Sequence, residues 1–142
     1  GTVASALGVE AAGAGPCVLL MGDVALAHDA GSLLGARRAG TALTIVLVDN
    51  GGGGIFDFLP VAAVAERRAY ERHILTAPAL DVPALAEASG FSYRPAASVA
   101  ELRQALEVPG PAIAHVRTDR AENIALHRRL WAEVRRAVRS AT

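Results

Sequence analysis

Two short apolar segments, Cys17–Met21 and Leu43–Val48, lie on either side of a segment of helical composition, Ala25–Ala39. Apolar runs of this length without alternating polar residues are typical of strands that are buried on both faces of a sheet. A helix between two strands of one sheet makes those strands parallel, because parallel neighbours need a long crossover connection. The sequence therefore predicts an α/β fold in which both segments are buried strands.

The rest of the chain continues this alternation of helices and strands. Helical composition covers Ala4–Ala12, Val82–Ser89, Val99–Leu106 and Asn123–Val138, whereas Phe91–Arg94 and Ala112–Val116 are short strand candidates. The last helical segment carries one apolar face, formed by Leu126, Leu130, Val134 and Val138. We expect a single parallel sheet of about five or six strands with helices on both faces.

Composition limits the kinds of partner that the chain could bind. It has 142 residues, 52% of them hydrophobic, and a formal net charge of zero, so we expect one domain with a core and no binding of nucleic acid. Its apolar runs are too short for membrane insertion. The single cysteine, Cys17, excludes an intrachain disulfide and favours the cytoplasm. Because the chain opens without methionine and within a helical pattern, we expect it to be part of a longer protein.

Polar residues follow the two predicted strands at the points where they end. Asp23 follows the first strand, and Asn50 follows the second, 27 residues later. The carboxyl ends of parallel strands meet at one edge of a sheet, so these side chains should lie close together. Their oxygen atoms are hard ligands that suit Mg²⁺. The glycine run Gly51–Gly54 would let a backbone carbonyl, with Gly52 as the first choice, turn toward the metal while N–H groups approach a diphosphate.

The same residues have a simpler interpretation. A strand-end aspartate that caps a helix, followed by a flexible loop that binds nothing, fits the spacing as well, because a lone glycine-rich match is a weak signal. The spacing alone leaves both interpretations open.

The motif also resembles a known family. Gly22-Asp23-Val24, followed at this spacing by Asp49-Asn50, resembles the diphosphate and magnesium motif of thiamine-diphosphate enzymes. The stretches GDVALAHDAGSLLGARR, TIVLVDNGGGGIFDFLP and VRTDRAENIALHRRLWAEV look like the C-terminal domain of the 2-succinyl-5-enolpyruvyl-6-hydroxy-3-cyclohexene-1-carboxylate synthase family of menaquinone biosynthesis. The general motif alone would also fit acetolactate synthases and benzoylformate decarboxylases.

The resemblance implies a set of site residues. Asp23, Asn50 and the carbonyl oxygen of Gly52 would bind Mg²⁺ or Mn²⁺, and the thiamine diphosphate site would comprise Gly22, Asp23, Val24, Ala25, Asn50, Gly52, Gly53 and Ile55. An apolar wall of Ile55, Phe56 and Leu59 would line the substrate. Val24 replaces the last glycine of the general motif, although this family commonly has a larger residue there, and Asp49 replaces its first asparagine. Thr76-Ala77-Pro78 stands where the family usually has Thr-Pro-His.

The resemblance also implies a reaction. Enzymes of this family decarboxylate 2-oxoglutarate and add the resulting succinyl carbanion to isochorismate, which makes them transferases. They activate the cofactor with a glutamate from another domain of a neighbouring subunit, and their substrate-binding arginines lie largely outside this stretch. We therefore expect residues 1–142 to be the cofactor-binding domain of a cytoplasmic homodimer or homotetramer, and to be inactive alone.

Alternative functions remain open from the sequence. The chain could belong to another thiamine-diphosphate carboligase or decarboxylase, or be a non-catalytic nucleotide-binding or interaction module of the same fold. The charged segment Pro60–Leu75 fits either a lid that orders over bound cofactor or an exposed helix. We interpret His28-Asp29 as structural hydrogen-bonding residues and His115 as a core or edge residue of a strand.

Overall fold

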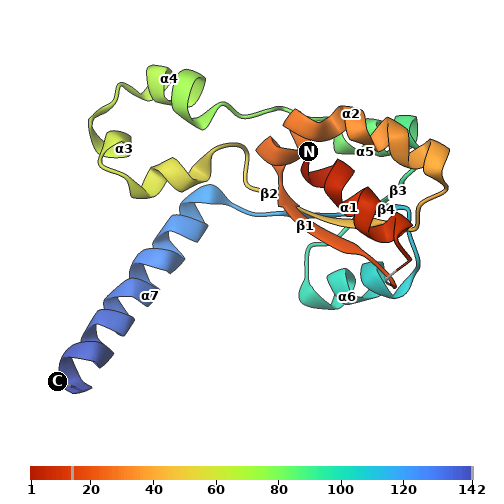
Figure 1. The fold of residues 1–142 in the computed structure, drawn as a ribbon. Helices are drawn as coiled ribbons and strands as arrows, with labels where there is room; N and C mark the ends of the chain where they lie inside the picture. Colours follow the sequence, from red (N-terminus) through yellow and green to blue (C-terminus); the bar gives the residue numbers. More distant parts are fainter. Residues whose placement is uncertain (14, 142) are drawn as a thin grey trace.

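The computed structural model describes residues 1–13 and 15–141 and confirms the predicted α/β fold. Four parallel strands form one sheet in the order β1-β2-β4-β3 (Figure 1). They are β1 (Val18–Gly22), β2 (Thr44–Asp49), β3 (Ser92–Pro95) and β4 (Ala112–Arg117). The expectation of five or six strands is wrong for the described residues, because the long segment between β2 and β3 forms only helical turns and loops.

Helices cover both faces of the sheet, as predicted. Helix α2 (Asp23–Ala39) connects β1 to β2 and packs on one face together with α1 (Thr2–Ala11) and α5 (Val82–Ser89). Helix α6 (Val99–Glu107) connects β3 to β4 and packs on the opposite face (Figure 1). The core of the first face comprises Leu26, Leu33, Ile45, Leu47 and Ile113, and that of the second comprises Val46, Ala105 and Ala114.

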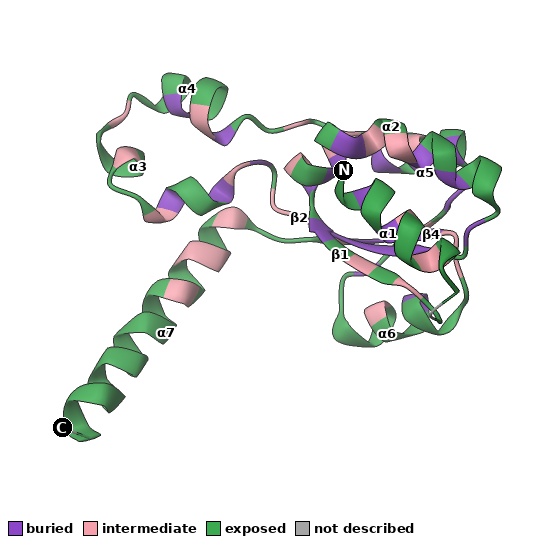
Figure 2. Cartoon of the chain, in the orientation of Figure 1, coloured by how far each residue is buried: buried purple, intermediate pink, exposed green. Residues whose placement is uncertain are grey.

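Strand β1 is not buried on both faces, in contrast to the prediction. Leu20 is 69% exposed and Val18 is 54% exposed, whereas Met21 is buried (Figure 2). The reason is that β1 is an edge strand, while α6 packs against β3 and β4 at the other edge. An apolar run therefore identified the strand correctly but did not reveal its place in the sheet.

Asp29 connects the first two helices, which confirms its predicted structural role. Its carboxylate accepts the backbone N–H of Val3 at 2.6 Å and the hydroxyl of Ser32 at 2.6 Å. The first of these bonds satisfies an N–H group in the opening turn of α1, where no intrahelical acceptor exists.

The segment after β2 has helical composition over Val64–Leu75, but it does not form one continuous helix. It forms η1 (Gly54–Phe58), α3 (Val61–Val64), α4 (Arg67–Tyr70) and a π-helical turn, η2 (Glu71–Leu75). The backbone is extended at Ala65 and Glu66, and the Glu66 carboxylate accepts the N–H groups of Arg68 and Ala69. That side chain caps a new helix, which is why helical composition does not produce one continuous helix. The role of this segment as a lid stays a prediction.

Helix α7 (Arg120–Ala141) begins and ends three residues beyond the predicted bounds and extends away from the sheet (Figure 1). Its apolar face is exposed, with Leu126 at 41% and Val134 at 60% (Figure 2). Near its start, His127 and Trp131 contact the ring of Phe58, with centroid separations of 5.4 and 5.1 Å. No helix formed by residues 1–13 or 15–141 has the length and apolar character needed to cross a membrane.

A single arginine on β3 closes the end of α6. The guanidinium group of Arg94 donates to the carbonyl oxygens of Ala105, Val108 and Pro109, at 2.6, 2.7 and 3.1 Å. The last carbonyl groups of a helix have no intrahelical donors, so this cation satisfies that of Ala105 and those of the two residues that follow α6, and it complements the helix dipole.

We expect Arg94→Met to lower the free energy of unfolding by about 2 kcal/mol, because it removes charged hydrogen bonds and leaves carbonyl groups without donors. Urea unfolding measures the change. Arg103→Met on the exposed side of α6 is the matched control and should change stability by less than about 0.5 kcal/mol. Equal effects of the two substitutions would contradict the capping role of Arg94.

Candidate functional site

The glycine run after β2 is needed for a close approach between two parts of the backbone. Gly51 and Gly52 have φ angles of +76° and +123°, which strongly favour glycine. A Cβ atom on Gly52 would lie 2.5 Å from the carbonyl oxygen of Leu75. The N–H of Gly53 donates to that same oxygen at 2.6 Å. The glycines therefore let the end of η2 lie directly against the loop.

Asp23 lies at the carboxyl end of β1, in the first turn of α2, and is only 4% exposed. Its Oδ2 atom accepts the backbone N–H of Gly52 at 2.7 Å. This bond brings together two of the three predicted metal ligands across the ends of two parallel strands. The Gly52 carbonyl accepts the N–H of Gly54 at 2.8 Å, which leaves one of its two lone pairs for another partner.

Asn50, the third predicted ligand, is oriented differently. Its side-chain nitrogen would lie 2.8 Å from a Cβ atom on Gly54, so the amide packs against the loop itself. The residues that line the pocket beside Asp23 include Asp49 and Gly51 but not Asn50.

That pocket has a volume of about 200 Å³ and lies at the carboxyl ends of β1 and β2. Asp23, Asp49 and Gly51 line it together with Val82 and the segment Ala77–Leu80. Burial raises the pKa of the Asp23 carboxyl above its ordinary value. The N–H groups of Val24 and Gly52 act in the opposite direction, and the negative charge of Asp49 adds to the increase. Two carboxylates facing one small pocket favour a cation there.

The predicted diphosphate residues lie beside this pocket. Gly22 is the N-cap of α2, and Val24 and Ala25 belong to its first turn. Gly22 and Ala25 are exposed, and the first N–H groups of a helix have no intrahelical acceptor, although that of Val24 already faces the Asp23 carboxylate. A helix N-terminus with free N–H groups favours an anion.

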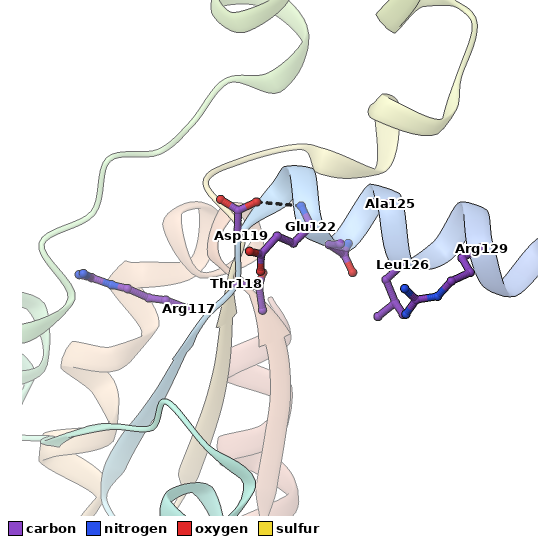
Figure 3. A pocket seen from close by; sticks show the side chains of 8 residues that line it. Arg117, Thr118, Asp119, Glu122, Ala125, Leu126 and Arg129 are labelled. Carbon is purple, nitrogen blue, oxygen red and sulfur yellow. Dashed lines mark hydrogen bonds between the residues drawn. The ribbon is translucent and has the colours of Figure 1, made fainter.

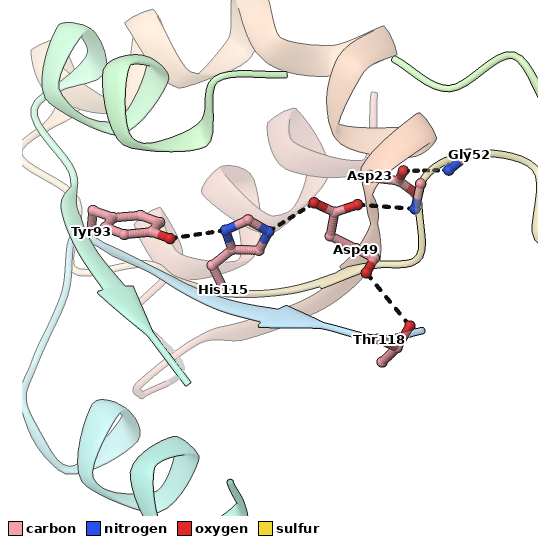
Figure 4. A network of polar contacts seen from close by, with 7 residues as sticks. Asp23, Asp49, Gly52, Tyr93, His115 and Thr118 are labelled. Atoms are coloured by element: carbon pink, nitrogen blue, oxygen red, sulfur yellow. Dashed lines mark hydrogen bonds and ion pairs between the residues drawn. The ribbon is translucent and has the colours of Figure 1, made fainter. Parts of the chain in front are cut away.

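A polar network that the sequence did not predict supports Asp49 (Figure 4). Its Oδ2 atom lies 3.0 Å from Nε2 of His115, whose Nδ1 lies 3.1 Å from the hydroxyl of Tyr93. Its Oδ1 accepts the N–H of Gly51 at 3.1 Å, and its backbone oxygen accepts that of Thr118 at 2.9 Å. His115 is a core residue, as predicted, but its polar partners come from β2 and β3. The only feature of the sequence that indicated this network is the single histidine within the apolar segment Ala112–Val116.

The predicted apolar wall is exposed in this chain. Ile55, Phe56 and Leu59 are 73%, 40% and 50% exposed, and none of them lines the pocket beside Asp23. The turn that carries them is held by Asp57, which is buried and accepts the Tyr70 hydroxyl at 2.9 Å. Nε of Arg120 lies 3.4 Å from the second oxygen of Asp57.

A larger pocket, of about 610 Å³, lies where β4 passes into α7 (Figure 3). Arg117 and Arg129 line it, but Arg117 extends toward the side opposite to Leu126 and Arg129 (Figure 3). The two guanidinium groups therefore do not converge on one ligand. None of the predicted site residues lines this pocket, so we place the candidate site at the Asp23 pocket.

The family described as "Thiamine pyrophosphate enzyme, C-terminal TPP binding domain" matches residues 1–116. The chain belongs to this family. The match includes Asp23, the glycine run and the pocket between them, and it confirms the thiamine-diphosphate resemblance found in the sequence.

Curated relatives of this thiamine pyrophosphate domain confirm the closer resemblance. The chain is 44% identical over 138 residues to a 2-succinyl-5-enolpyruvyl-6-hydroxy-3-cyclohexene-1-carboxylate synthase of Myxococcus xanthus, covering 94% of the chain and 23% of the relative. It is 40% identical over 142 residues to the synthase of Geobacillus kaustophilus, covering 97% of the chain and 24% of the relative. The chain thus spans about a quarter of the length of these relatives.

Solved structures agree on the fold. Benzoylformate decarboxylase from Polynucleobacter necessarius matches with a TM-score of 0.66 and 25% identity, over 84% of this chain and 23% of that chain. The fold is therefore shared with decarboxylases, whereas the sequence is closer to the synthases.

We expect Gly52→Ala to lower the free energy of unfolding by about 3 kcal/mol, because the added methyl group meets the Leu75 carbonyl and the φ angle is unfavourable for alanine. Gly35→Ala is the control, since nothing lies within 4 Å of its Cβ position on α2, and it should stabilise the chain by about 1 kcal/mol. Thermal unfolding of both variants decides, and a neutral Gly52→Ala would refute the tight approach.

We expect Asp23→Asn to stabilise the chain at neutral pH in the absence of divalent cations. The raised pKa means that the folded state binds the Asp23 proton more tightly than the unfolded state, so ionisation reduces stability as pH rises through that pKa. The amide oxygen of asparagine still accepts the Gly52 N–H. The gain should therefore be largest at neutral pH and vanish in acid, below the ordinary carboxyl pKa.

Urea unfolding across this pH range measures the effect. Asp81→Asn is the control, because asparagine caps α5 as well as aspartate does and should change stability by less than about 0.5 kcal/mol. A stability difference for Asp23→Asn that stays constant with pH would show that the charge of Asp23 is not its cause.

Proposed function

We propose that this domain holds the diphosphate of thiamine diphosphate through Mg²⁺ or Mn²⁺, and that residues 1–142 are the C-terminal domain of a longer enzyme. The observation that carries the proposal is the buried Asp23 carboxylate, bonded to the glycine loop and facing the same pocket as Asp49. A divalent cation would offset both negative charges, and the family match identifies thiamine diphosphate as the cofactor.

The oxygen atoms available fit a magnesium ion. No three His, Cys, Asp or Glu side chains in ranges 1–13 and 15–141 gather closely enough to hold a metal, so amide and backbone oxygens must contribute. Asp23 has one oxygen outside its bond to Gly52, the Gly52 carbonyl has a free lone pair, and Asn50 would supply its side-chain oxygen. Mg²⁺ prefers such ligands and shares its remaining positions with phosphate and water.

The diphosphate would lie between two sets of backbone N–H groups. The first set lies at the start of α2, at Gly22, Val24 and Ala25, and the second lies in the loop, at Ile55. Gly53 would line the diphosphate through its backbone without donating to it, because its N–H is bonded to the Leu75 carbonyl. Thiamine diphosphate, when bound, supplies the electron sink that removal of carbon dioxide from a 2-oxo acid requires. Ile55, Phe56 and Leu59 would line the substrate and exclude water from the reacting carbon.

The proposed reaction is that of the synthase relatives, a transferase step of menaquinone biosynthesis. In it, 2-oxoglutarate loses carbon dioxide and its remaining four carbons are added to isochorismate. The supporting observation is the 44% identity over 94% of the chain. A glutamate from a neighbouring subunit and arginines from other domains would complete the site, so the protein would act as a homodimer or homotetramer and the isolated domain would be inactive. We place this enzyme in the cytoplasm.

A second candidate is a decarboxylase or carboligase of the same superfamily, such as an acetolactate synthase. The shared fold with benzoylformate decarboxylase favours it. The identity of 25% to that structure is well below the identity to the synthases, so we rank it second.

Calorimetric titration of this chain with thiamine diphosphate tests the cofactor proposal. We expect heat of binding that requires Mg²⁺ and disappears in Asp23→Asn, because that substitution removes the anionic ligand while preserving the fold. Asp81→Asn should bind like the wild type. If thiamine diphosphate binds neither this chain nor the intact protein in the presence of Mg²⁺, the domain is a non-catalytic module.

Substrate assays of the intact protein distinguish the two candidate reactions. The synthase proposal expects carbon dioxide release from 2-oxoglutarate that depends on isochorismate. Turnover of benzoylformate or pyruvate, with none of 2-oxoglutarate, would instead establish the decarboxylase or carboligase alternative.

A further inference from the structure

His115 is the one described histidine whose ring is buried between two polar side chains from different strands (Figure 4). Its side chain is 1% exposed, whereas that of Asp49 is 26% exposed. It lies on β4, between Tyr93 of β3 and Asp49 of β2. The three side chains therefore form a continuous path from the edge strand β3 to the pocket beside Asp23.

The chemistry of the three groups orders their hydrogen bonds. Asp49 is an acceptor, so Nε2 of His115 donates to its Oδ2 atom over 3.0 Å. With Nε2 protonated, neutral imidazole has an acceptor at Nδ1, which receives the Tyr93 hydroxyl hydrogen over 3.1 Å. The Asp49 carboxylate thereby selects the tautomer, and the Tyr93 hydroxyl bonds the remaining ring nitrogen and holds the imidazole in place.

The Asp49 carboxylate, oriented by His115, also holds the glycine loop. Its Oδ1 atom accepts the N–H of Gly51, and the next residue, Gly52, donates its own N–H to Asp23. A partly exposed carboxylate has other rotamers that point toward water, and each of them would release Gly51. The bond from His115 holds the rotamer that keeps the loop against Asp23.

We propose that His115 is a positioning residue for the cation and diphosphate site, acting through Asp49, and that Tyr93 holds its ring in place. This inference rests on the proposed function of the Asp23 pocket. It assigns Asp49 a role that differs from coordination: its oriented carboxylate supplies negative charge beside the cation and fixes the conformation of Gly51. Partners that orient a metal site in this way typically change its affinity by 10-fold to 100-fold when removed.

Two substitutions of His115 that differ in side-chain length distinguish a positioning role from a packing role. In His115→Gln, the side-chain nitrogen can take the place of Nε2 and still donate to Asp49. In His115→Asn, the shorter amide reaches only toward Tyr93, so the Asp49 carboxylate loses its donor. Ser89→Ala is the control, because Ser89 is also buried and hydrogen-bonded, to the Leu85 and Ala86 carbonyls of α5.

The measurement is Mn²⁺ binding to the intact protein, followed by electron paramagnetic resonance at saturating thiamine diphosphate. We expect His115→Asn to weaken Mn²⁺ affinity by about 10-fold or more, and His115→Gln to recover most of that loss. Ser89→Ala should leave Mn²⁺ affinity unchanged, even where its melting temperature falls as far as that of His115→Asn. Tyr93→Phe, which keeps the aromatic ring, should weaken affinity in the same direction and decides the matter if His115→Asn does not fold.

The outcomes also separate this inference from the proposed function. If wild type binds Mn²⁺, Asp23→Asn does not, and His115→Asn and Tyr93→Phe both bind like wild type, the positioning role is wrong and the proposed function stands. Equal losses in His115→Asn and His115→Gln would likewise overturn it, since the donor to Asp49 would then be irrelevant. If wild type itself binds no Mn²⁺ with thiamine diphosphate, both proposals are wrong.

Discussion

The hydrogen bond from the backbone N–H of Gly52 to the buried carboxylate of Asp23 determines the geometry of the candidate site. It joins the end of β1 to the loop that follows β2. Because the two strands are parallel, their carboxyl ends lie at the same end of the sheet. Glycine is required at this position, because Gly52 adopts a φ of +123° and an added Cβ atom would lie 2.5 Å from the Leu75 carbonyl oxygen. The start of α2, the glycine loop and the end of η2 are thus positioned by one contact.

The two carboxylates of this site destabilise the fold in the absence of a ligand, and a bound cation would remove that destabilisation. Asp23 is buried beside a second carboxylate, Asp49, and its raised pKa reflects that burial first. A chain selected for stability alone would place an uncharged side chain at Asp23, since an asparagine oxygen accepts the Gly52 N–H equally well. Buried like charges are common where proteins bind metals or perform catalysis, because the ligand, rather than the fold, compensates them.

Sequence reasoning could predict contacts that follow from local order along the chain. The succession of strand, helix and strand was sufficient to place Asp23 near the glycine loop, because a crossover fixes the strand direction. It could not place β1 at the edge of the sheet, since the order β1-β2-β4-β3 depends on where a distant part of the chain returns. For the same reason, the sequence did not identify Leu75 as the neighbour that requires glycine at Gly52, or Tyr93 and Asp49 as the partners of His115.

The apolar wall depends on a second set of long-range contacts. Asp57, in the turn that carries Ile55 and Phe56, is bonded to Tyr70 of α4 and paired with Arg120 at the start of α7. One of its oxygens lacks a hydrogen bond among the described residues, and the arginine nitrogen lies 3.4 Å away, longer than an optimal charged bond. A buried carboxylate with one weakly matched partner is sensitive to small movements of either helix. The position of the wall is therefore coupled to α4 and α7, although neither helix contributes a residue to the pocket beside Asp23.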